Sequence, residues 1–359
     1  MGNTPPYFLE KIQVAKEQQL KELDLSWDHH TDKDQKLTEI PEEVFELEWL
    51  EVLNLNSNRV TTIPESIGNL SNLTFLNLND NQVNNFSDSI AALSNLNYLK
   101  LYNNKLTELP DVITKIEHLT HLFLCKNKIS KLSDSITALS NLTDLNLSRN
   151  KINELPNSIT ALSNLTKLNL SHNQINKLPN SITALSNLTD LDLSRNELRE
   201  LPDSITALSN LTYLNLSGNE LRELPDSITA LSNLTYLDLS NNLLNQLPNS
   251  VSCLSNLIHL YLDSNEFSQL PNSISCLFNL SFLSLINNRL NQLPNSINCL
   301  SSLIELDLTG NKIKSIPKNI KKLKRLEILD LDNNPIETPP IEVVKQGVEA
   351  IKDYFRQLE

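Results

Sequence analysis

Leucines occupy fixed places in a 23-residue frame that repeats along most of the chain. In segment 188–196, leucines stand at the first, fourth and sixth positions and an asparagine closes the frame. The alternation of Leu191, Asp192 and Leu193 has a period of two, which is the period of a half-buried β-strand. The pattern therefore predicts a short strand in each unit, with leucines on one side and variable residues on the other.

The asparagine that closes the frame predicts a sharp turn after each strand. A short amide has two donors and one acceptor, so it can satisfy backbone groups inside such a turn. It occurs at thirteen evenly spaced positions, each one frame after the last: Asn58, Asn81, Asn104, Asn127, Asn150, Asn173, Asn196, Asn219, Asn242, Asn265, Asn288, Asn311 and Asn334. We expect these side chains to point inward and to form a ladder.

The rest of each unit returns along the opposite side of the predicted stack. In segment 201–210, Ile205 and Leu208 lie three residues apart, which points both side chains inward. One unit cannot bury its own leucines, whereas stacked units bury them together, at roughly 1.5–3 kcal/mol for each leucine. The frame resembles the leucine-rich repeat. This resemblance implies an α/β repeat solenoid, a horseshoe with a parallel concave sheet.

The frame starts fourteen times, at Leu20, Leu50, Leu73, Leu96, Leu119, Leu142, Leu165, Leu188, Leu211, Leu234, Leu257, Leu280, Leu303 and Leu326. Only the first unit is irregular, because it is longer than the others and its excess of seven falls in segment 28–34. Two later units replace the usual Leu-Pro by Phe86-Ser87 and Leu132-Ser133, which predicts an altered outer turn. The predicted domains are an N-terminal helical cap at 1–19, a solenoid at 20–341, and a C-terminal capping or junction helix at 342–359.

Apolar residues at helical spacing support both caps. In the N-terminal cap these residues are Phe8, Ile12 and Ala15. In the C-terminal cap they are Val344, Val348, Ile351, Phe355 and Leu358.

A formal net charge of −13 argues against general nucleic-acid binding, because phosphate recognition depends on Lys and Arg. A basic partner is therefore favoured over an acidic one. Seven cations nevertheless gather between Lys312 and Arg325. Such a run is usually a solvated face, and the alternative is a contact with an acidic neighbouring domain. The candidate inter-domain contacts are Lys318, Lys321, Lys322, Arg325, Tyr354 and Phe355.

Three of the four cysteines also follow the repeat. Cys253, Cys276 and Cys299 occupy the place that alanine holds in earlier units, for example Ala207. This substitution predicts small, buried, reduced side chains. Cys125 lies in a predicted strand on the open face and is expected to be the more accessible thiol.

A search for catalytic chemistry finds little. Five glycines are too few for a P-loop or a dinucleotide-binding loop, and Cys-x-x-Cys, His-Glu-x-x-His and a nucleophile elbow are absent. The insertion carries possible metal ligands, but no glycine or helical spacing organises them: Asp28, His29, His30, Asp32 and Asp34. We expect a metal-free polar loop and a non-enzymatic protein without a cofactor.

No apolar run is long enough for a membrane span, and the N-terminal segment lacks the features of a secretory signal. Asn-Leu-Thr triplets begin at Asn141, Asn164, Asn187, Asn210 and Asn233. Sugars at these positions would pack against the stack on a eukaryotic secretory route. We therefore expect a cytoplasmic or bacterial setting, or translocation without a conventional signal peptide if the protein is an effector.

The open face is formed by residues six, four and two positions before each asparagine. One aromatic group there contains Phe75, Tyr98, Tyr102, His121 and Phe123, and a second contains Tyr213, Tyr236, His259, Tyr261 and Phe282. Candidate carboxylate contacts are Asp190, Asp192, Asp238 and Asp263. Cross-strand packing alone also favours aromatics at such positions. The functional interpretation is a protein interface, since aromatic anchors rimmed by charge are typical of interfaces.

The C-terminal segment carries a second resemblance. Residues 334–344, Asn-Pro-Ile-Glu-Thr-Pro-Pro-Ile-Glu-Val-Val, and the helix at 347–358 are similar to the junction helix of bacterial Roco proteins. In that family a leucine-rich repeat region of this 23-residue type leads into a Ras-like GTPase domain and a dimerising COR domain. The resemblance implies a regulatory repeat region beside a GTPase domain that would lie beyond Glu359. The alternative is a free-standing bacterial effector or adaptor that binds a host protein.

Overall fold

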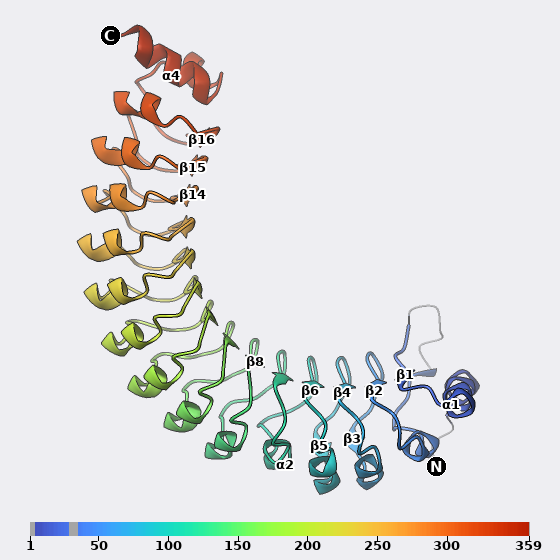
Figure 1. Cartoon of the computed structure of the whole chain (residues 1–359). Coiled ribbons are helices and arrows are strands. Elements are labelled where there is room, and N and C mark those ends of the chain that lie inside the picture. The colour runs from blue at the N-terminus through green and yellow to red at the C-terminus, as the bar shows by residue number, and fades with distance from the viewer. Residues whose placement is uncertain (1–3, 29–34, 359) are drawn as a thin grey trace. The chain divides into compact units, whose positions relative to one another are not determined.

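The computed structural model describes residues 4–28 and 35–358. It divides into two compact units, residues 1–174 and 175–359. In each unit a repeat runs from a short strand through a turn to an outer segment that contains a short helix (Figure 1). Most of the predicted insertion, including His29, His30, Asp32 and Asp34, lies outside the described residues.

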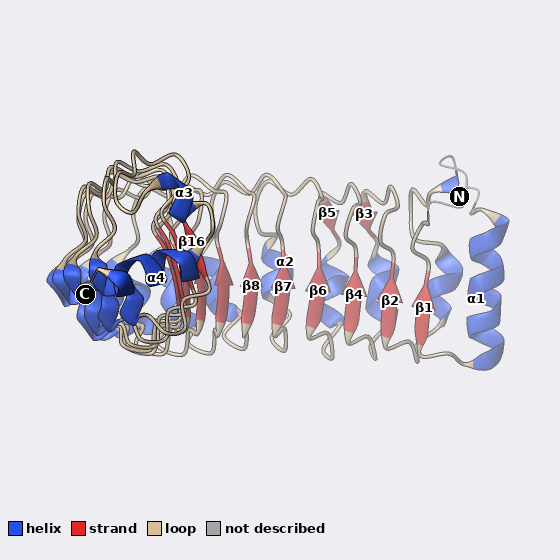
Figure 2. Cartoon of the chain, turned by 90° about the horizontal axis from the view of Figure 1, so that it is seen from above, coloured by secondary structure: helices blue, strands red, loops and turns tan. Residues whose placement is uncertain are grey.

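Unit 1 begins with helix α1 (Pro6–Gln18), and its main sheet is parallel with its strands in chain order. Six of its strands stand side by side in Figure 2: β1 (Glu22–Asp24), β2 (Val52–Asn54), β4 (Phe75–Asn77), β6 (Tyr98–Lys100), β7 (His121–Phe123) and β8 (Asp144–Asn146). Strand β9 (Lys167–Asn169) pairs with β8. The outer helices are η2 (Glu42–Glu46), η3 (Glu65–Asn69), η4 (Asp88–Ala92), α2 (Asp111–Thr114), η5 (Asp134–Ala138) and η6 (Asn157–Ala161). Strands β3 (Thr62–Ile63) and β5 (Asn85–Phe86) form a separate parallel pair.

Unit 2 follows the same plan. Its strands are β10 (Asp190–Asp192), β11 (Tyr213–Asn215), β12 (Tyr236–Asp238), β13 (His259–Tyr261), β14 (Phe282–Ser284), β15 (Glu305–Asp307) and β16 (Ile328–Asp330). Its outer 3-10 helices are η7 (Asn180–Ala184), η8 (Asp203–Ala207), η9 (Asp226–Ala230), η10 (Asn249–Cys253), η11 (Asn272–Cys276), η12 (Asn295–Cys299) and η13 (Lys318–Lys322). Helices α3 (Ile341–Val344) and α4 (Val348–Gln357) complete the unit.

The core of each unit lies between the strands and the outer helices. Leu191 and Leu193 are fully buried from the strand side, and Ile205 and Leu208 are fully buried from the outer side. Equivalent residues of adjacent repeats align because the strands pair in register, as Leu214 does with Leu237. This is the solenoid of parallel strands that the sequence predicts.

The predicted asparagine ladder is present within each unit. Asn219 shows its bonding pattern: its Oδ1 accepts from the backbone N–H of Leu198 at 3.0 Å. Its Nδ2 donates to the carbonyl oxygens of Leu193 at 3.0 Å and Leu216 at 2.9 Å. Leu193 and Leu198 belong to the preceding repeat, so one side chain joins two repeats. Asn334, in the last repeat, is only half-buried.

A second column of amides also joins repeats, at the start of the strands. Asn210 Nδ2 donates to the carbonyl of Ser186 at 2.7 Å, and Asn233 Nδ2 donates to that of Ser209 at 2.9 Å. Both belong to the Asn-Leu-Thr triplets. Their regular spacing in the sequence is the signal of this second column.

The two repeats without Leu-Pro keep the backbone of the usual outer turn, which corrects the expectation of an altered one: φ and ψ are −69° and 151° at Ser87, and −70° and 149° at Pro202. Only the way in which the turn is stabilised differs. The hydroxyls of Ser87 and Ser133 cap η4 and η5 by accepting from the backbone N–H groups of Ser89 at 3.2 Å and Ser135 at 3.3 Å. Proline holds the same position in other repeats and makes no side-chain cap. A serine oxygen thus replaces the fixed backbone angle of proline.

The caps agree with the sequence only in part. Phe8, Ile12 and Ala15 of α1 are buried as expected. The C-terminal helix, in contrast, breaks at Gly347, whose φ of 91° is outside the helical region. Val348, Ile351 and Phe355 of α4 are buried, whereas Leu358 is 53% exposed, so the predicted stripe is shorter than expected.

All four cysteines are free, as expected, but the prediction that three of them are buried was wrong. Cys253 and Cys299 are exposed and Cys276 is half-buried. Each follows a buried apolar residue by two positions at the end of a 3-10 helix, and this offset turns the side chain away from the core. Cys125 is itself only half-exposed, so it is not the more accessible thiol.

The ladder gives a testable stability effect. Asn219→Ala should lower the free energy of unfolding by about 1–3 kcal/mol, because it removes the acceptor of the buried N–H of Leu198 and one donor from each of two carbonyls. Exposed Asn245 makes the matched control, and Asn245→Ala should change stability by no more than about 0.5 kcal/mol. Urea denaturation measures both, and equal midpoints for the two variants would refute the role of the ladder.

Candidate functional site

We define the strand face as the residues six, four and two positions before each ladder asparagine. In β11 the half-buried Tyr213 and Asn215 flank the fully buried Leu214. The same alternation in the neighbouring strands confirms that the positions six and four before the asparagine lie on the solvent side of the sheet. The position two before the asparagine lies past the strand and is buried in some repeats, as at Ser194 and Ser240. Because adjacent strands pair in register, side chains of this face form rows across the repeats.

The unit 1 aromatic cluster is a stack on β4, β6 and β7. The ring of Tyr98 lies 5.1 Å from Phe75, 4.6 Å from His121 and 5.3 Å from Phe123, between ring centroids. Among the described residues, no aromatic ring contact joins Tyr102 to this stack. The sequence therefore grouped one residue too many.

Lysine side chains of the same chain lie over the aromatic rings of unit 1. Lys100 Nζ lies 5.4 Å from the ring centroids of both Phe75 and Tyr98. Lys126 Nζ lies 5.4 Å from the ring centroid of Tyr102. These are cation–π distances, so two lysines lie against the aromatic rings of unit 1. A carboxylate is also near, because burial and then the charge of Asp144 raise the pKa of Tyr98.

The unit 2 aromatic cluster contains all five predicted residues. Tyr213 and Tyr236 stack at 4.5 Å with an interplanar angle of 14°. Tyr236 is 5.3 Å from Tyr261, which is 4.8 Å from Phe282. His259 is 6.2 Å from both Tyr236 and Phe282. The rings form one continuous half-buried row over β11 to β14.

Carboxylates surround this row. Burial is the largest effect that raises the pKa of Tyr236, and the negative charge of Asp238 raises this pKa further. Burial also raises the pKa values of Tyr213 and Tyr261, with added effects from Asp192 and Asp238 respectively. The structure thus brings all four predicted carboxylates near the cluster, with weaker effects of Asp190 on the pKa of Tyr213 and of Asp263 on the pKa of Tyr261.

The predicted carboxylate Asp263 is held rigidly. Its Oδ1 accepts from the backbone N–H of Ile286 at 2.9 Å and from the hydroxyl of Ser284. Burial raises the pKa of Asp263 above its ordinary value despite these hydrogen bonds. Further acids lie on the same face, at Glu305, Asp307, Asp330 and Asp332.

The predicted inter-domain contacts are only partly on the surface. Lys318, Lys322 and Arg325 are exposed, and Tyr354 is half-buried. Lys321 Nζ donates to the carbonyl of Phe355 at 3.1 Å. Phe355 is 1% exposed, which corrects its assignment as a contact residue, because the apolar side of α4 packs on the last outer helix.

A buried lysine reinforces this end of unit 2. Lys352 is 2% exposed, and its Nζ donates to the carbonyl of Leu326 at 2.8 Å and to Glu349 Oε1 at 2.7 Å. These bonds attach α4 to the last repeat. No sequence pattern marks Lys352, because a lysine on an amphipathic helix is ordinarily exposed.

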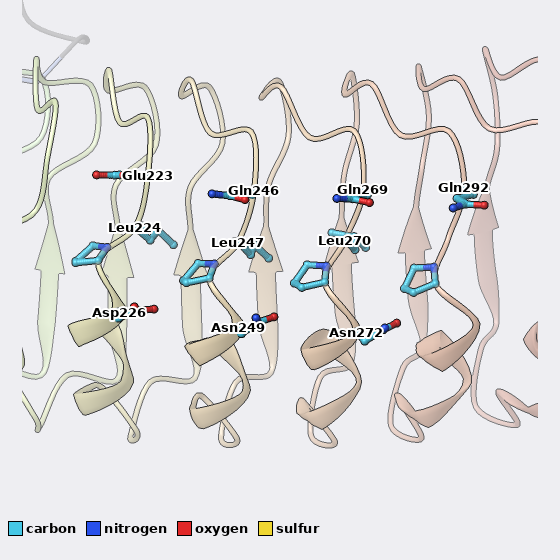
Figure 3. Close-up of a pocket in the computed structure, with 14 residues that line it drawn as sticks. Glu223, Leu224, Asp226, Gln246, Leu247, Asn249, Gln269, Leu270, Asn272 and Gln292 are labelled. Atoms are coloured by element: carbon cyan, nitrogen blue, oxygen red, sulfur yellow. The ribbon is translucent and has the colours of Figure 1, made fainter.

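A shallow groove of about 820 Å³ runs along the outer side of unit 2 (Figure 3). Glu223, Gln246, Gln269 and Gln292 form one rim, and Asp226, Asn249 and Asn272 lie beyond the prolines, towards the 3-10 helices. The Leu-Pro steps between these rows recur in most repeats as part of the outer turn. The groove therefore follows from the repeat itself, whereas the strand face differs from repeat to repeat.

Comparisons with known proteins agree with this architecture. A family model described as leucine-rich repeat region matches residues 202–281. A model described as leucine rich repeat matches residues 33–83, 117–175 and 163–221. A third, described as leucine rich repeats in two copies, matches residues 301–342. A solved leucine-rich repeat protein of Leptospira interrogans is 37% identical, with 93% of this chain and 83% of that chain covered and a TM-score of 0.88.

This chain is a leucine-rich repeat protein.

Other solved structures are more distant from this leucine-rich repeat protein. The functional domain of InlJ from Listeria monocytogenes is 25% identical, with 92% of this chain and 66% of that chain covered and a TM-score of 0.73. YopM from Yersinia enterocolitica is 27% identical, with 95% of this chain and 71% of that chain covered and a TM-score of 0.63. No curated protein matches the chain.

Two searches of the described residues were negative. None of their helices has the length and apolar character needed to cross a membrane. No group of three or more metal-capable His, Cys, Asp or Glu side chains was found there either.

The environment of the unit 2 tyrosines predicts their titration. In the folded leucine-rich repeat protein, the phenols of Tyr213, Tyr236 and Tyr261 should ionise above the ordinary pKa of 10.0, because burial and carboxylates disfavour the phenolate. The unfolded chain ionises first, so folding stability should fall as the pH rises above 10.0. Absorbance titration measures this effect, and Tyr236→Phe should remove one late-ionising group. Identical curves for native and denatured protein would contradict this.

Proposed function

We propose that this leucine-rich repeat protein is a non-enzymatic module that binds a protein partner through its strand face. The observation that carries the proposal is the unit 2 aromatic cluster, a half-buried row from Tyr213 to Phe282 surrounded by carboxylates. Aromatic anchors dominate the binding energy of protein interfaces. Asp190, Asp192, Asp238 and Asp263 are proposed as the polar contacts around them.

Folding alone accounts for the stacking of these rings but not for their charged surroundings. Burial raises the pKa values of Tyr213, Tyr236 and Tyr261, and the negative charges beside them raise these values further. Carboxylates grouped without cations repel one another and do not stabilise a sheet. A partner that supplies the opposite charge would offset this repulsion.

The unit 1 aromatic cluster is the second proposed contact surface. Phe75, Tyr98 and Phe123 stack there, and Tyr102 lies beside Lys126. The lysines give this surface a different charge from the unit 2 cluster, so the two surfaces suit different parts of a partner.

As the biological setting, we propose the regulatory repeat region of a Roco-type GTPase in the cytoplasm. The support is the resemblance of segment 334–358 to a Roco junction helix. The exposed Lys318, Lys322 and Arg325, together with Lys321 and Tyr354, would contact the GTPase domain. Sequence that follows Glu359 and carries Gly-x-x-x-x-Gly-Lys-Ser/Thr would support this assignment.

The alternative is a free-standing effector or adaptor of a bacterium that binds a host protein. It is favoured by the similarity to repeat proteins of Leptospira, Listeria and Yersinia over most of this chain. Sequence beyond Glu359 without a GTPase domain would support this alternative. Both settings use the strand face in the same way.

The strand face can be tested with any protein partner obtained by pull-down. Tyr236→Ala and Tyr261→Ala should each weaken binding at least about tenfold, since a buried aromatic anchor typically contributes about 2 kcal/mol or more. Thermal stability should fall by only a few degrees, because neither ring belongs to the leucine core.

Two controls locate the effect. Phe278 is 54% exposed and lies off the strand face, so Phe278→Ala removes an aromatic ring elsewhere in unit 2. Lys321→Ala changes the basic outer segment. Loss of binding in Lys321→Ala with the tyrosine variants unaffected would place the interface at the basic segment and refute the proposal.

A further inference from the structure

The strand face of unit 2 has one sign of charge. Its acidic residues are Asp190, Asp192, Asp238, Asp263, Glu305, Asp307, Asp330 and Asp332, and the sequence places no lysine or arginine at any strand-face position of this unit. The aromatic row runs through the middle of this set. Asp238 is central, because it follows Tyr236 by two residues and pairs in register with Tyr261.

Unit 1 shows how a cation sits on the same kind of surface. Lys100 Nζ lies 5.4 Å from the centroids of Phe75 and Tyr98, which are themselves stacked at 5.1 Å. In unit 2, Asn215 and Asp238 hold the column position of Lys100 beside Tyr213 and Tyr236. The unit 2 row therefore has the aromatic platform without a cation from its own strand face.

We propose that the strand face of unit 2 binds an arginine-bearing segment of its protein partner, with a guanidinium over Tyr236 and Tyr261 and paired to Asp238. Guanidinium fits because it is planar, stacks on aromatic rings and donates to carboxylates from two nitrogens at once. The inference rests on the proposed function and specifies the chemistry of the partner.

The chain itself shows that the charge of this column is independent of the fold. Asp192 Oδ1 accepts from the backbone N–H of Ser194 at 3.0 Å, and Asn215 Oδ1 accepts from that of Ser217 at 3.0 Å. Asp238 makes the same bond to Ser240 at 2.9 Å. Aspartate and asparagine are thus structurally equivalent here, and only the charge differs.

The outer groove supplies a control pair with the same property. Glu223 holds the position of Gln246 in the next repeat, and Asp226 holds that of Asn249. The outer pair of substitutions is Glu223→Gln with Asp226→Asn. The inner pair is Asp192→Asn with Asp238→Asn. Both pairs remove two negative charges from unit 2. Each variant places in one repeat an amide that a neighbouring repeat already carries.

The experiment measures binding of the peptide Gly-Arg-Gly-Arg-Gly-Arg to the full chain by calorimetry, with the glutamate analogue as a negative probe. Asp192→Asn with Asp238→Asn should weaken binding at least about tenfold, because truncating one partner of a close charge pair is costly. The outer pair should weaken binding less than about twofold, because exposed distant charges are screened by salt. Tyr236→Leu should weaken binding, and Tyr236→Phe should retain it because the ring remains.

Two results would overturn the inference. Equal weakening by the inner and outer pairs would show only general attraction to an acidic protein, and equal binding of the glutamate peptide would exclude charge selection. The proposed function is tested separately, by measuring how the tyrosine variants bind the protein partner obtained by pull-down. If Tyr236→Ala weakens that partner while the arginine peptide does not bind, the strand-face function stands and the arginine inference fails.

Discussion

The side-chain amide of the ladder asparagine is the interaction on which the other features depend. Asn219 accepts from one backbone N–H of the preceding repeat and donates to a carbonyl in each of two repeats. This geometry requires a tight turn, and the residue before the asparagine adopts positive φ, 66° at Gly218 and 53° at Arg195. Forming the amide bonds offsets the cost of that conformation for a residue such as arginine.

Fixing the turn also fixes the strand, and this separates folding from recognition. The buried leucines and the ladder set the register, so the two solvent-side positions of each strand can differ in charge between repeats without a change of fold. Asp192 and Asn215 illustrate this separation, because both cap the following serine N–H while only one is charged. The aromatic and charged character of the strand face is therefore free to vary along a constant scaffold.

Periodicity in the sequence identified equivalent positions well and their orientation less well. The ladder and the buried sides of the strands follow from a period of two within each strand and a constant interval between repeats. The cysteine column failed because substitution for alanine indicates small size, not burial, and 3-10 geometry turned Cys253 outward. Phe355 was expected to contact a neighbouring domain but is buried within this chain. The apolar stripe of a helix does not show whether the stripe faces a partner or its own chain. The five aromatic residues of unit 2 were grouped correctly because register alone brings them together.

The two aromatic clusters show how charge can give one scaffold separate binding preferences. In unit 1, Lys100 lies over the rings, and a second cation approaching Tyr98 would meet like charge. In unit 2 the rings of Tyr236 and Tyr261 lie among carboxylates, which attract the same cation. Stacked rings by themselves discriminate weakly among flat or cationic groups, so attraction at one cluster and repulsion at the other together provide the selectivity. A partner segment rich in arginine is thereby directed to unit 2 by charge, while the aromatic rings supply the binding energy.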